Sequence, residues 1–182
     1  MTDYVLVPHG SGATQSAALT VVARVALARA GAMRFEYRLT GEIAKLAIPR
    51  RLPPQRTERL WEHTCFEAFV APAGGDGYCE LNFSPSTEWA VYEFDGYRQG
   101  MRPLVSAAPT LTVVETASEL RVMASAELGA FARAPWPWRI GLTAVVEDRA
   151  GGRSYFALEH PRAKPDFHDA AAFAISLDGS AR

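Results

Sequence analysis

Alternation of polar and apolar residues with a period of two runs through most of this chain and constrains its fold more than any other feature. Met33, Phe35, Tyr37 and Leu39 show it clearly, because charged residues stand between them. Successive side chains of a β-strand point to opposite faces, so this period predicts strands that bury one face. Similar runs cover residues 4–7, 19–27, 66–70, 78–83, 89–94, 110–115, 120–128, 140–147, 154–160 and 173–177. We therefore expect about ten or eleven strands.

Turn signals between neighbouring runs predict antiparallel pairing. A short polar turn separates residues 110–115 from 120–128, and the sequence DRAGG separates 140–147 from 154–160, which predicts two hairpins. Residues 18–30 are rich in alanine and could form a helix, but their β-branched cluster favours a strand. Many short strands without a convincing long helix predict an all-β fold, an antiparallel β-sandwich or jelly roll. The 182 residues contain no linker-like stretch, so residues 1–182 are expected to form a single domain.

Charge and composition argue against several classes of partner. The 19 basic and 20 acidic residues are spread along the sequence and leave a net charge of -1, which predicts no nucleic-acid-binding surface. No segment approaches the roughly 18 apolar residues of a membrane span. The N-terminus, MTDYVLVPHG, has neither the positive start nor the apolar length of a signal peptide. We therefore expect a soluble, cytoplasmic protein that binds neither nucleic acid nor membrane.

Two cysteines, Cys65 and Cys79, are too few for a disulfide framework. Alternation places Cys79 on the core side of its strand, together with Leu81 and Phe83. We expect both thiols to be reduced and buried as small hydrophobic side chains.

Polar and aromatic residues gather between residues 61 and 98. By alternation, Tyr78, Glu80 and Asn82 share one strand face. Such a face suits a small polar ligand, because aromatic rings stack on sugar rings while carboxylates and amides hydrogen-bond hydroxyl groups. The candidate ligand-binding residues here are Trp61, His63, Glu67, Tyr78, Glu80, Asn82, Trp89, Tyr97 and Arg98.

Each of these residues also has a structural interpretation. Trp61 and Trp89 could be core or edge residues, since tryptophan is usually largely buried. Glu67 alternates with residues expected to be buried, so its carboxylate would need a partner such as Arg98 or a tyrosine. A solvated strand face would explain Glu80 and its neighbours equally well.

A second polar cluster lies in the sequence EHPRAKPDFHD, where two prolines stiffen the chain. Its candidate ligand-binding residues are His160, Lys164 and His168. We predict that this loop and the strand face bearing Glu80 meet at one cavity, because loops at the rim of a sandwich commonly complete a site. The histidine spacing does not match a zinc site, so no metal site is predicted. Calcium would require the fold to bring together Glu67, Glu80, Asp95 and Asp166.

Three segments carry a resemblance to a known family: LWEHTCFEAF, YCELNFSPSTEWAVYEFDGYR and ALEHPRAKPDFHDAAAFAISL. They resemble the bacterial DOMON-like proteins, which are related to family 9 carbohydrate-binding modules, and the similarity runs from about residue 35 to 177. The resemblance implies a β-sandwich whose relatives bind sugars or haem, and it implies no catalytic activity. Carbohydrate is thus the leading ligand class.

Other functions remain open. Haem would need an axial ligand from His63, His160, Met101 or Met123, and none has a spacing that marks haem, so the cofactor is unknown, with neither haem nor calcium favoured. Catalysis is not expected. Glu67 and Glu80 could form a carboxylate pair for glycoside hydrolysis, with His168 as a base, but no nucleophile motif or phosphate loop is present. A protein-interaction domain without a small ligand is the third alternative.

Overall fold

The computed structural model describes residues 1–11, 18–29 and 32–179, and in this part of the chain the regular structure is all-β, with short 3-10 helices and no α-helix. The strands are β1 (Tyr4–Pro8), β2 (Thr20–Arg29), β3 (Ala32–Thr40), β4 (Cys65–Pro72), β5 (Tyr78–Phe83), β6 (Trp89–Phe94), β7 (Arg102–Pro103), β8 (Thr110–Glu115), β9 (Glu119–Glu127), β10 (Trp138–Glu147), β11 (Arg153–Ala157) and β12 (Ile175–Leu177). The 3-10 helices include η2 (Ile43–Lys45), η3 (Leu60–Glu62), η4 (Gly129–Arg133) and η5 (Ala170–Ala172). No helix among the described residues is long and apolar enough to cross a membrane.

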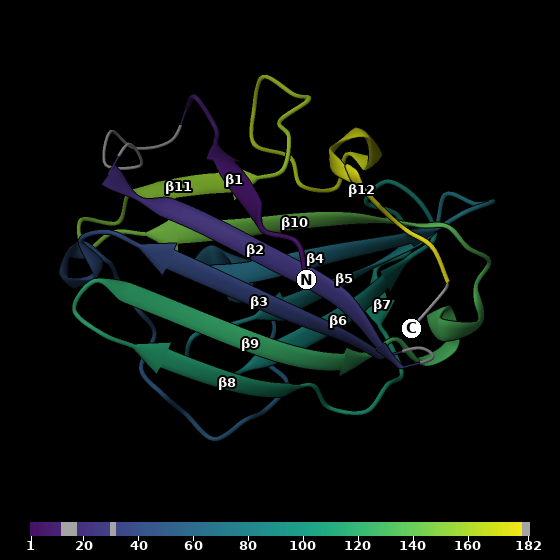
Figure 1. Cartoon of the computed structure of the whole chain (residues 1–182), viewed down its shortest axis with the longest axis horizontal. Coiled ribbons are helices and arrows are strands. Elements are labelled where there is room, and N and C mark those ends of the chain that lie inside the picture. Colours follow the sequence, from purple (N-terminus) through teal and green to yellow (C-terminus); the bar gives the residue numbers. More distant parts are fainter. Residues whose placement is uncertain (12–17, 30–31, 180–182) are drawn as a thin grey trace.

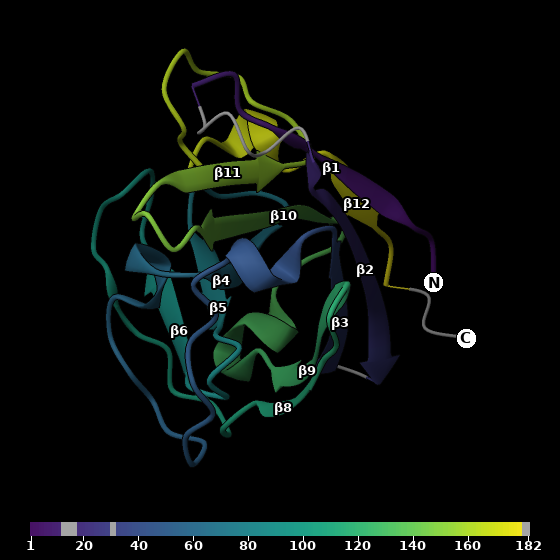
Figure 2. The same ribbon diagram turned by 90° about the vertical axis from the view of Figure 1, so that its left-hand side faces the viewer.

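The strands form one curled antiparallel sheet in the order β7-β6-β5-β4-β10-β11-β1-β2-β3-β9-β8, and β12 pairs with β10 beside this path. Strand β1 pairs with β11 on one side and with β2 on the other, so it joins two halves. We call β4 to β7 with β10, β11 and β12 the back sheet, and β2, β3, β8 and β9 the front sheet. The two sheets face each other as the layers of a sandwich (Figures 1 and 2).

The predicted fold class is confirmed, and so are both predicted hairpins, β8 with β9 and β10 with β11. The alanine-rich stretch forms strand β2 in its described part, as its β-branched residues favour. Two predicted strands are shorter than expected. Strand β11 ends at Ala157, before the proline-stiffened loop. In the run at 173–177 only Ile175–Leu177 form a strand, because η5 ends just before it. The Asp169 carboxylate caps η5 by accepting a hydrogen bond from the Ala171 N–H at 2.9 Å. The two-residue strand β7 is too short for alternation to predict.

The core lies between the two sheets and is apolar on both sides. Aromatic rings meet across it: Phe35 and Phe83 have ring centroids 5.5 Å apart, and Tyr37 and Phe66 are 5.1 Å apart. The Tyr37 hydroxyl donates to the Glu67 carbonyl at 2.6 Å, which satisfies the polar end of a fully buried side chain. Burial of this apolar area is the main source of stability, at about 25 cal/mol per Å².

Both cysteines are free and buried, as predicted. Cys79 faces the core between the sheets, whereas Cys65 belongs to a second apolar cluster on the outer face of the back sheet. Burial raises the pKa of both thiols, which keeps them protonated and unreactive.

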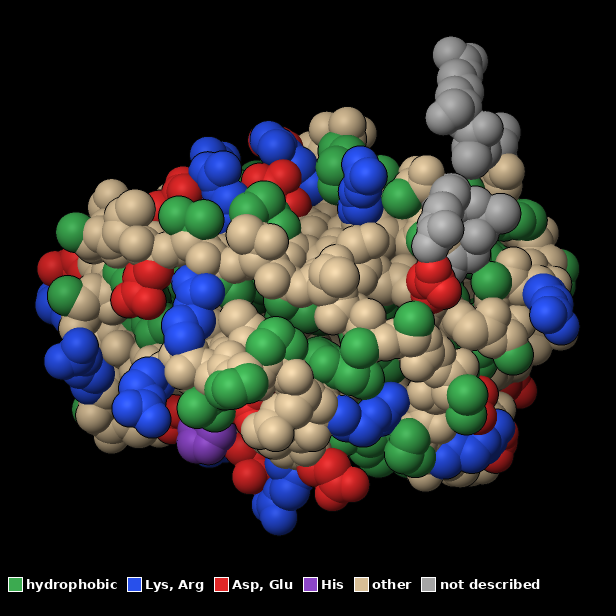
Figure 3. Space-filling view, turned by 90° about the horizontal axis from the view of Figure 1, so that it is seen from below, with side chains coloured by type: hydrophobic (Ala, Val, Ile, Leu, Met, Phe, Trp, Pro, Cys, Tyr) green, Lys and Arg blue, Asp and Glu red, His purple; other side chains and the backbone are tan. Residues whose placement is uncertain are grey.

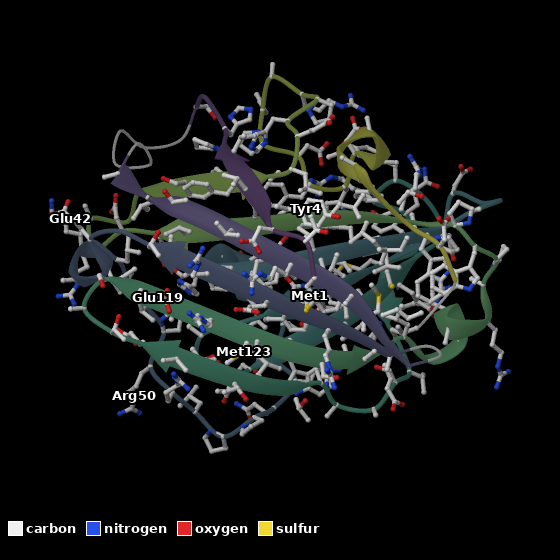
Figure 4. The ribbon with its side chains drawn as sticks, in the orientation of Figure 1. Met1, Tyr4, Glu42, Arg50, Glu119 and Met123 are labelled. Carbon is white, nitrogen blue, oxygen red and sulfur yellow. The ribbon has the colours of Figure 1, made fainter. Side chains whose placement is uncertain are left out.

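The outer faces of the two sheets differ. On the front sheet, charged side chains form a ladder of ion pairs, such as Arg24 with Glu36 at 3.4 Å and Arg121 with Glu119 at 2.8 Å. Figure 4 shows Glu119 and Met123 on this face. Positive and negative side chains are also interspersed on the surface seen from below in Figure 3. The back sheet, by contrast, carries the second apolar cluster beneath loops, and this cover creates the site described next.

Candidate functional site

A pocket of about 330 Å³ lies on the outer face of the back sheet. Its floor comes from β4 and β5, and its walls come from η3, from the loop between β6 and β7, and from the C-terminal loop after β11. Figure 1 shows this C-terminal loop in yellow beyond the end of β11. The pocket is lined by Trp61, Glu67, Glu80, Phe94, Arg98, Met101, Val145, Arg153, Tyr155, Pro165, Phe167 and His168.

Strand register brings the two floor carboxyls together. Glu67 pairs with Asn82 and Phe69 pairs with Glu80, so Glu67 and Glu80 are diagonal neighbours on one face. Cys79 packs in the core between the sheets, on the opposite face of β5. The predicted division of this strand into a polar face and a core face is therefore confirmed.

Glu67 is only 2% exposed, and its two carboxyl oxygens are treated differently. One oxygen, Oε2, accepts from the Thr143 hydroxyl at 3.4 Å, whereas Oε1 has no hydrogen-bond partner among the described residues. Burial, reinforced by the negative charge of Glu80, raises the pKa of this carboxyl well above its usual value. The expectation that Arg98 or a tyrosine would pair with it is wrong: Thr143 is the bonded partner, and Arg98 acts only through its charge.

Glu80 is 3% exposed and accepts a hydrogen bond from the Asn82 side-chain amide at 2.8 Å. Burial raises the pKa of its carboxyl to about 7, even though the Asn82 bond and the Arg98 charge favour the ionised form. Asn82 does not line the pocket, but its hydrogen bond orients the Glu80 carboxyl.

His168 closes the polar floor from the C-terminal loop. The Tyr78 oxygen accepts a hydrogen bond from the Arg98 backbone N–H at 3.2 Å. Burial raises the pKa of Tyr78 to about 12, so the hydroxyl keeps its proton. It donates this proton in a hydrogen bond to His168 Nδ1 at 2.7 Å. This network assigns the remaining ring proton to Nε2, which faces Glu80 Oε2 at 3.8 Å. Burial lowers the pKa of His168 to about 4, so the ring is neutral at neutral pH. The predicted meeting of this loop with the face bearing Glu80 is confirmed.

Arg98 ties the two covering loops together. Its guanidinium donates to Asp166 Oδ1 at 2.9 Å, and Asp166 also accepts from the Tyr97 hydroxyl. The Arg98 backbone is left-handed, with φ 55°. This ion pair holds the charged end of Arg98 at the pocket rim, where half of the side chain is exposed.

Aromatic rings form the apolar walls. Trp61 on η3 is half-buried and meets Tyr92 edge-on at 6.1 Å, and Tyr155 meets Phe167 edge-on at 6.1 Å. The Tyr92 hydroxyl, on the strand next to Glu80, is buried and has no partner among the described residues. Tyr92 does not line the pocket itself, so the pocket combines aromatic walls with one buried carboxyl oxygen, Glu67 Oε1, that has no partner in the described part of the chain.

Several predicted site residues lie outside this pocket. Trp89 pairs with Phe83 and packs in the core between the sheets, with the Arg56 guanidinium 4.9 Å from its ring. The side chain of His63 is 65% exposed and bonds Glu147 at 2.8 Å. The expectation that these two line the site with Glu80 is wrong, because η3 turns His63 outward and strand pairing turns Trp89 inward.

Five other predicted residues do not line the pocket: Tyr78 and Asn82, which bond His168 and Glu80 from beside it, and Tyr97, His160 and Lys164. His160 donates from Nε2 to the Val7 carbonyl at 2.9 Å, which fixes it against β1. Lys164 is exposed. Tyr97 lines a neighbouring hollow together with Tyr78 and His168. Of the predicted residues, Trp61, Glu67, Glu80, Arg98 and His168 line the pocket itself.

Sequence reasoning missed several lining residues. Arg153 and Tyr155 alternate with buried Ser154 and Phe156, and the predicted hairpin places Tyr155 opposite Val145. That register was a usable signal. Met101, Pro165 and Phe167 stand on loops, where no pattern indicates direction.

The candidate cofactor ligands are dispersed. Of the four residues considered for haem, only Met101 lines the pocket. Asp95 bonds Arg102 at 2.8 Å and Asp166 bonds Arg98, away from the two floor carboxyls. Within the described residues no group of three His, Cys, Asp or Glu side chains could hold a metal ion.

No protein-family model matches the chain, and no curated protein sequence matches it significantly. Its fold is similar to that of a Bacteroides uniformis protein provisionally assigned as carbohydrate-binding, with a TM-score of 0.63 at 13% identity over 94% of this chain and 84% of that one. It is also similar to a family 9 carbohydrate-binding module from Caldicellulosiruptor kristjanssonii in complex with cellotriose, with a TM-score of 0.51 at 9% identity over 86% of this chain and 72% of that one. A family 9 module from the same organism in complex with glucose has a TM-score of 0.51 at 10% identity over 85% of this chain and 73% of that one. The chain therefore has the all-β fold of these proteins.

Proposed function

We propose that this protein binds a small carbohydrate in the pocket on the outer face of the back sheet and catalyses no reaction there. The observation that carries the proposal is the combination in one pocket of aromatic walls with two buried carboxyls, one of which has an oxygen, Glu67 Oε1, without a partner among the described residues. Sugars need both, because their C–H faces stack on aromatic rings and their hydroxyls require hydrogen bonds. The similar fold of a family 9 carbohydrate-binding module with cellotriose supports the choice of ligand class.

Each group has a defined part in this binding. The half-exposed Trp61 offers its ring at the wall, and Glu67 Oε1 and Glu80 Oε2 accept hydrogen bonds from sugar hydroxyls at the floor. His168 Nε2 and the Arg98 guanidinium donate to sugar oxygens. The volume of about 330 Å³ is at the small end for ligand pockets, which favours one or two sugar rings over a long chain.

Binding is favoured over hydrolysis by the placement of the two carboxyls. A glycosidase pair flanks the bond that it cleaves, whereas Glu67 and Glu80 project from one sheet face as diagonal neighbours. The segments quoted above also lead us to infer a relationship to the DOMON-like proteins.

A glycan array followed by calorimetric titration of the best ligand tests the proposal. Trp61→Ala is expected to weaken binding at least about tenfold, equivalent to about 1.4 kcal/mol, because the stacking surface is lost. The matched control is Trp136→Ala, since Trp136 is also half-buried but stacks on Trp138 outside the pocket. The proposal is wrong if no glycan binds, or if both variants weaken binding equally.

A further inference from the structure

The pocket floor holds two carboxyls, and a neutral sugar does not need two carboxyls for binding. Glu67 and Glu80 lie as diagonal neighbours at the bottom of the pocket, almost completely buried, and neither forms a direct ion pair with an arginine or lysine of the described residues. Hydroxyl groups can be bound by amides or by a single carboxylate. A buried pair of carboxyls therefore indicates a ligand group that compensates negative charge.

The cations around the pocket are directed elsewhere. Arg98 lowers the pKa of both carboxyls through its charge, but its guanidinium bonds Asp166 at the rim. Arg153 is exposed at the opening, and His168 is neutral. The pocket thus has a basic rim and an acidic floor.

The remaining titratable groups near the pair contribute no positive charge. From β4, β5 and β6 they are Cys65, Tyr78 and Tyr92, and burial raises the pKa of each, so all three stay neutral. Tyr155 on β11 lies on the wall.

The geometry points to a sugar with a free amino group, such as a hexosamine, whose ammonium lies between Glu67 and Glu80. This inference rests on the proposed function and names the substrate class for the same pocket. Glu67 Oε1 is an acceptor buried on the pocket floor with no partner among the described residues, and Glu80, its diagonal neighbour on the same face, offers Oε2 as a second acceptor. An ammonium has three donors and no acceptor, which matches this set.

Aromatic walls favour an organic cation over a metal ion. An ammonium gains from the faces of nearby rings, and Trp61 and Tyr155 line the same pocket as the carboxyls. A calcium ion would take six to eight oxygen ligands, whereas the floor supplies two carboxyls.

Proton release is a signature of this arrangement. Because the pKa of Glu80 is about 7 and that of Glu67 is raised well above its usual value, the pair in the free pocket is partly protonated at pH 7. An arriving ammonium takes over the role of the bound proton, which is released to solvent. A neutral sugar leaves the proton in place.

Calorimetric titration at pH 7 with D-glucosamine, D-glucose and N-acetyl-D-glucosamine tests the inference in two buffers of different ionisation heat. We expect glucosamine to bind at least about tenfold more tightly than either neutral sugar, through charge-assisted hydrogen bonds, with an enthalpy that depends on the buffer. Glu67→Gln and Glu80→Gln should each reduce the preference to about threefold or less. Glu36→Gln, a partly exposed carboxylate of the front sheet, is the control and should keep the full preference.

The outcomes separate the two proposals. If glucose binds as tightly as glucosamine, the inference is wrong while carbohydrate binding stands. If none of the three sugars binds, the inference is also wrong, and the glycan array decides separately on carbohydrate binding. An unchanged preference in both folded glutamine variants would likewise overturn the inference.

Discussion

The outer faces of both sheets carry a glutamate, but the front face is charged and open whereas the back face is largely apolar and lies beneath loops. On the front sheet, Glu36 is partly exposed between Arg24 at 3.4 Å and Arg121 at 3.8 Å. On the back sheet, Glu80 is sealed beneath loops and bonds Asn82 at 2.8 Å. Screening keeps the interactions of Glu36 weak, whereas burial raises the pKa of Glu80 to about 7. The difference teaches that a glutamate becomes part of a site where its strand face is apolar and loops cover it.

The largest expected effect tests whether the loops truly bury the outer face of the back sheet. Phe69 is fully buried there and stacks on Phe173 of the C-terminal segment at 5.5 Å. Phe69→Ala should lower the free energy of unfolding by about 3–5 kcal/mol. Val114→Ala on the front sheet, where the side chain is exposed, should change it by less than about 0.5 kcal/mol. Urea denaturation measures both, and similar small effects would show that the outer face of the back sheet is open.

The next effect concerns pH and the two buried titratable groups of the site. Glu80 has a raised pKa, so its contribution to stability is complete below about 4.5 and is lost as pH rises through about 7. His168 has a lowered pKa, so its contribution is complete above 6.5 and is lost as pH falls through about 4. Each amounts to about 3 kcal/mol, and the two oppose each other between pH 4.5 and 6.5. Glu67, whose pKa is also raised, adds to the decrease in the free energy of unfolding as pH rises.

Single substitutions reveal this hidden balance. As pH rises from 4.5 to 6.5, the free energy of unfolding of Glu80→Gln should increase by about 2–3 kcal/mol more than that of the unsubstituted protein. The reason is that the stabilisation by neutral His168 is then no longer offset by the loss from Glu80. His168→Asn should lose a similar amount over the same range. Denaturation at three pH values measures the slopes. Parallel curves for all three proteins would mean that these groups titrate as they do in water.

The pattern of strands was predictable, but the cover over them was not. Residues 89–94 and 110–115 were predicted to the residue, since alternation depends on neighbours in the chain. The sequence did not show that Trp89 faces the core, because β6 is largely buried on both faces and alternation then gives no direction. Phe167 and Met101 reach the pocket from loops, whose paths depend on distant contacts such as Arg98 with Asp166.

The smallest expected effect belongs to the front sheet. Glu36→Gln should lower the free energy of unfolding by no more than about 1 kcal/mol, because exposed ion pairs are weak. The loss should shrink in 1 M salt, where the Debye length is about 3 Å. A large loss that salt does not change would remove the contrast between the two faces.

The central claim is that the covered pocket of the back sheet binds sugar and the open face of the front sheet does not. Amide and indole chemical shifts during titration with the best ligand from the glycan array test it most directly, since one spectrum reports on both faces. We expect concentration-dependent shifts at Trp61, Glu80, Arg98 and His168, and none at Glu36 or Met123. Shifts confined to the front sheet, or none up to saturating sugar, would contradict the account.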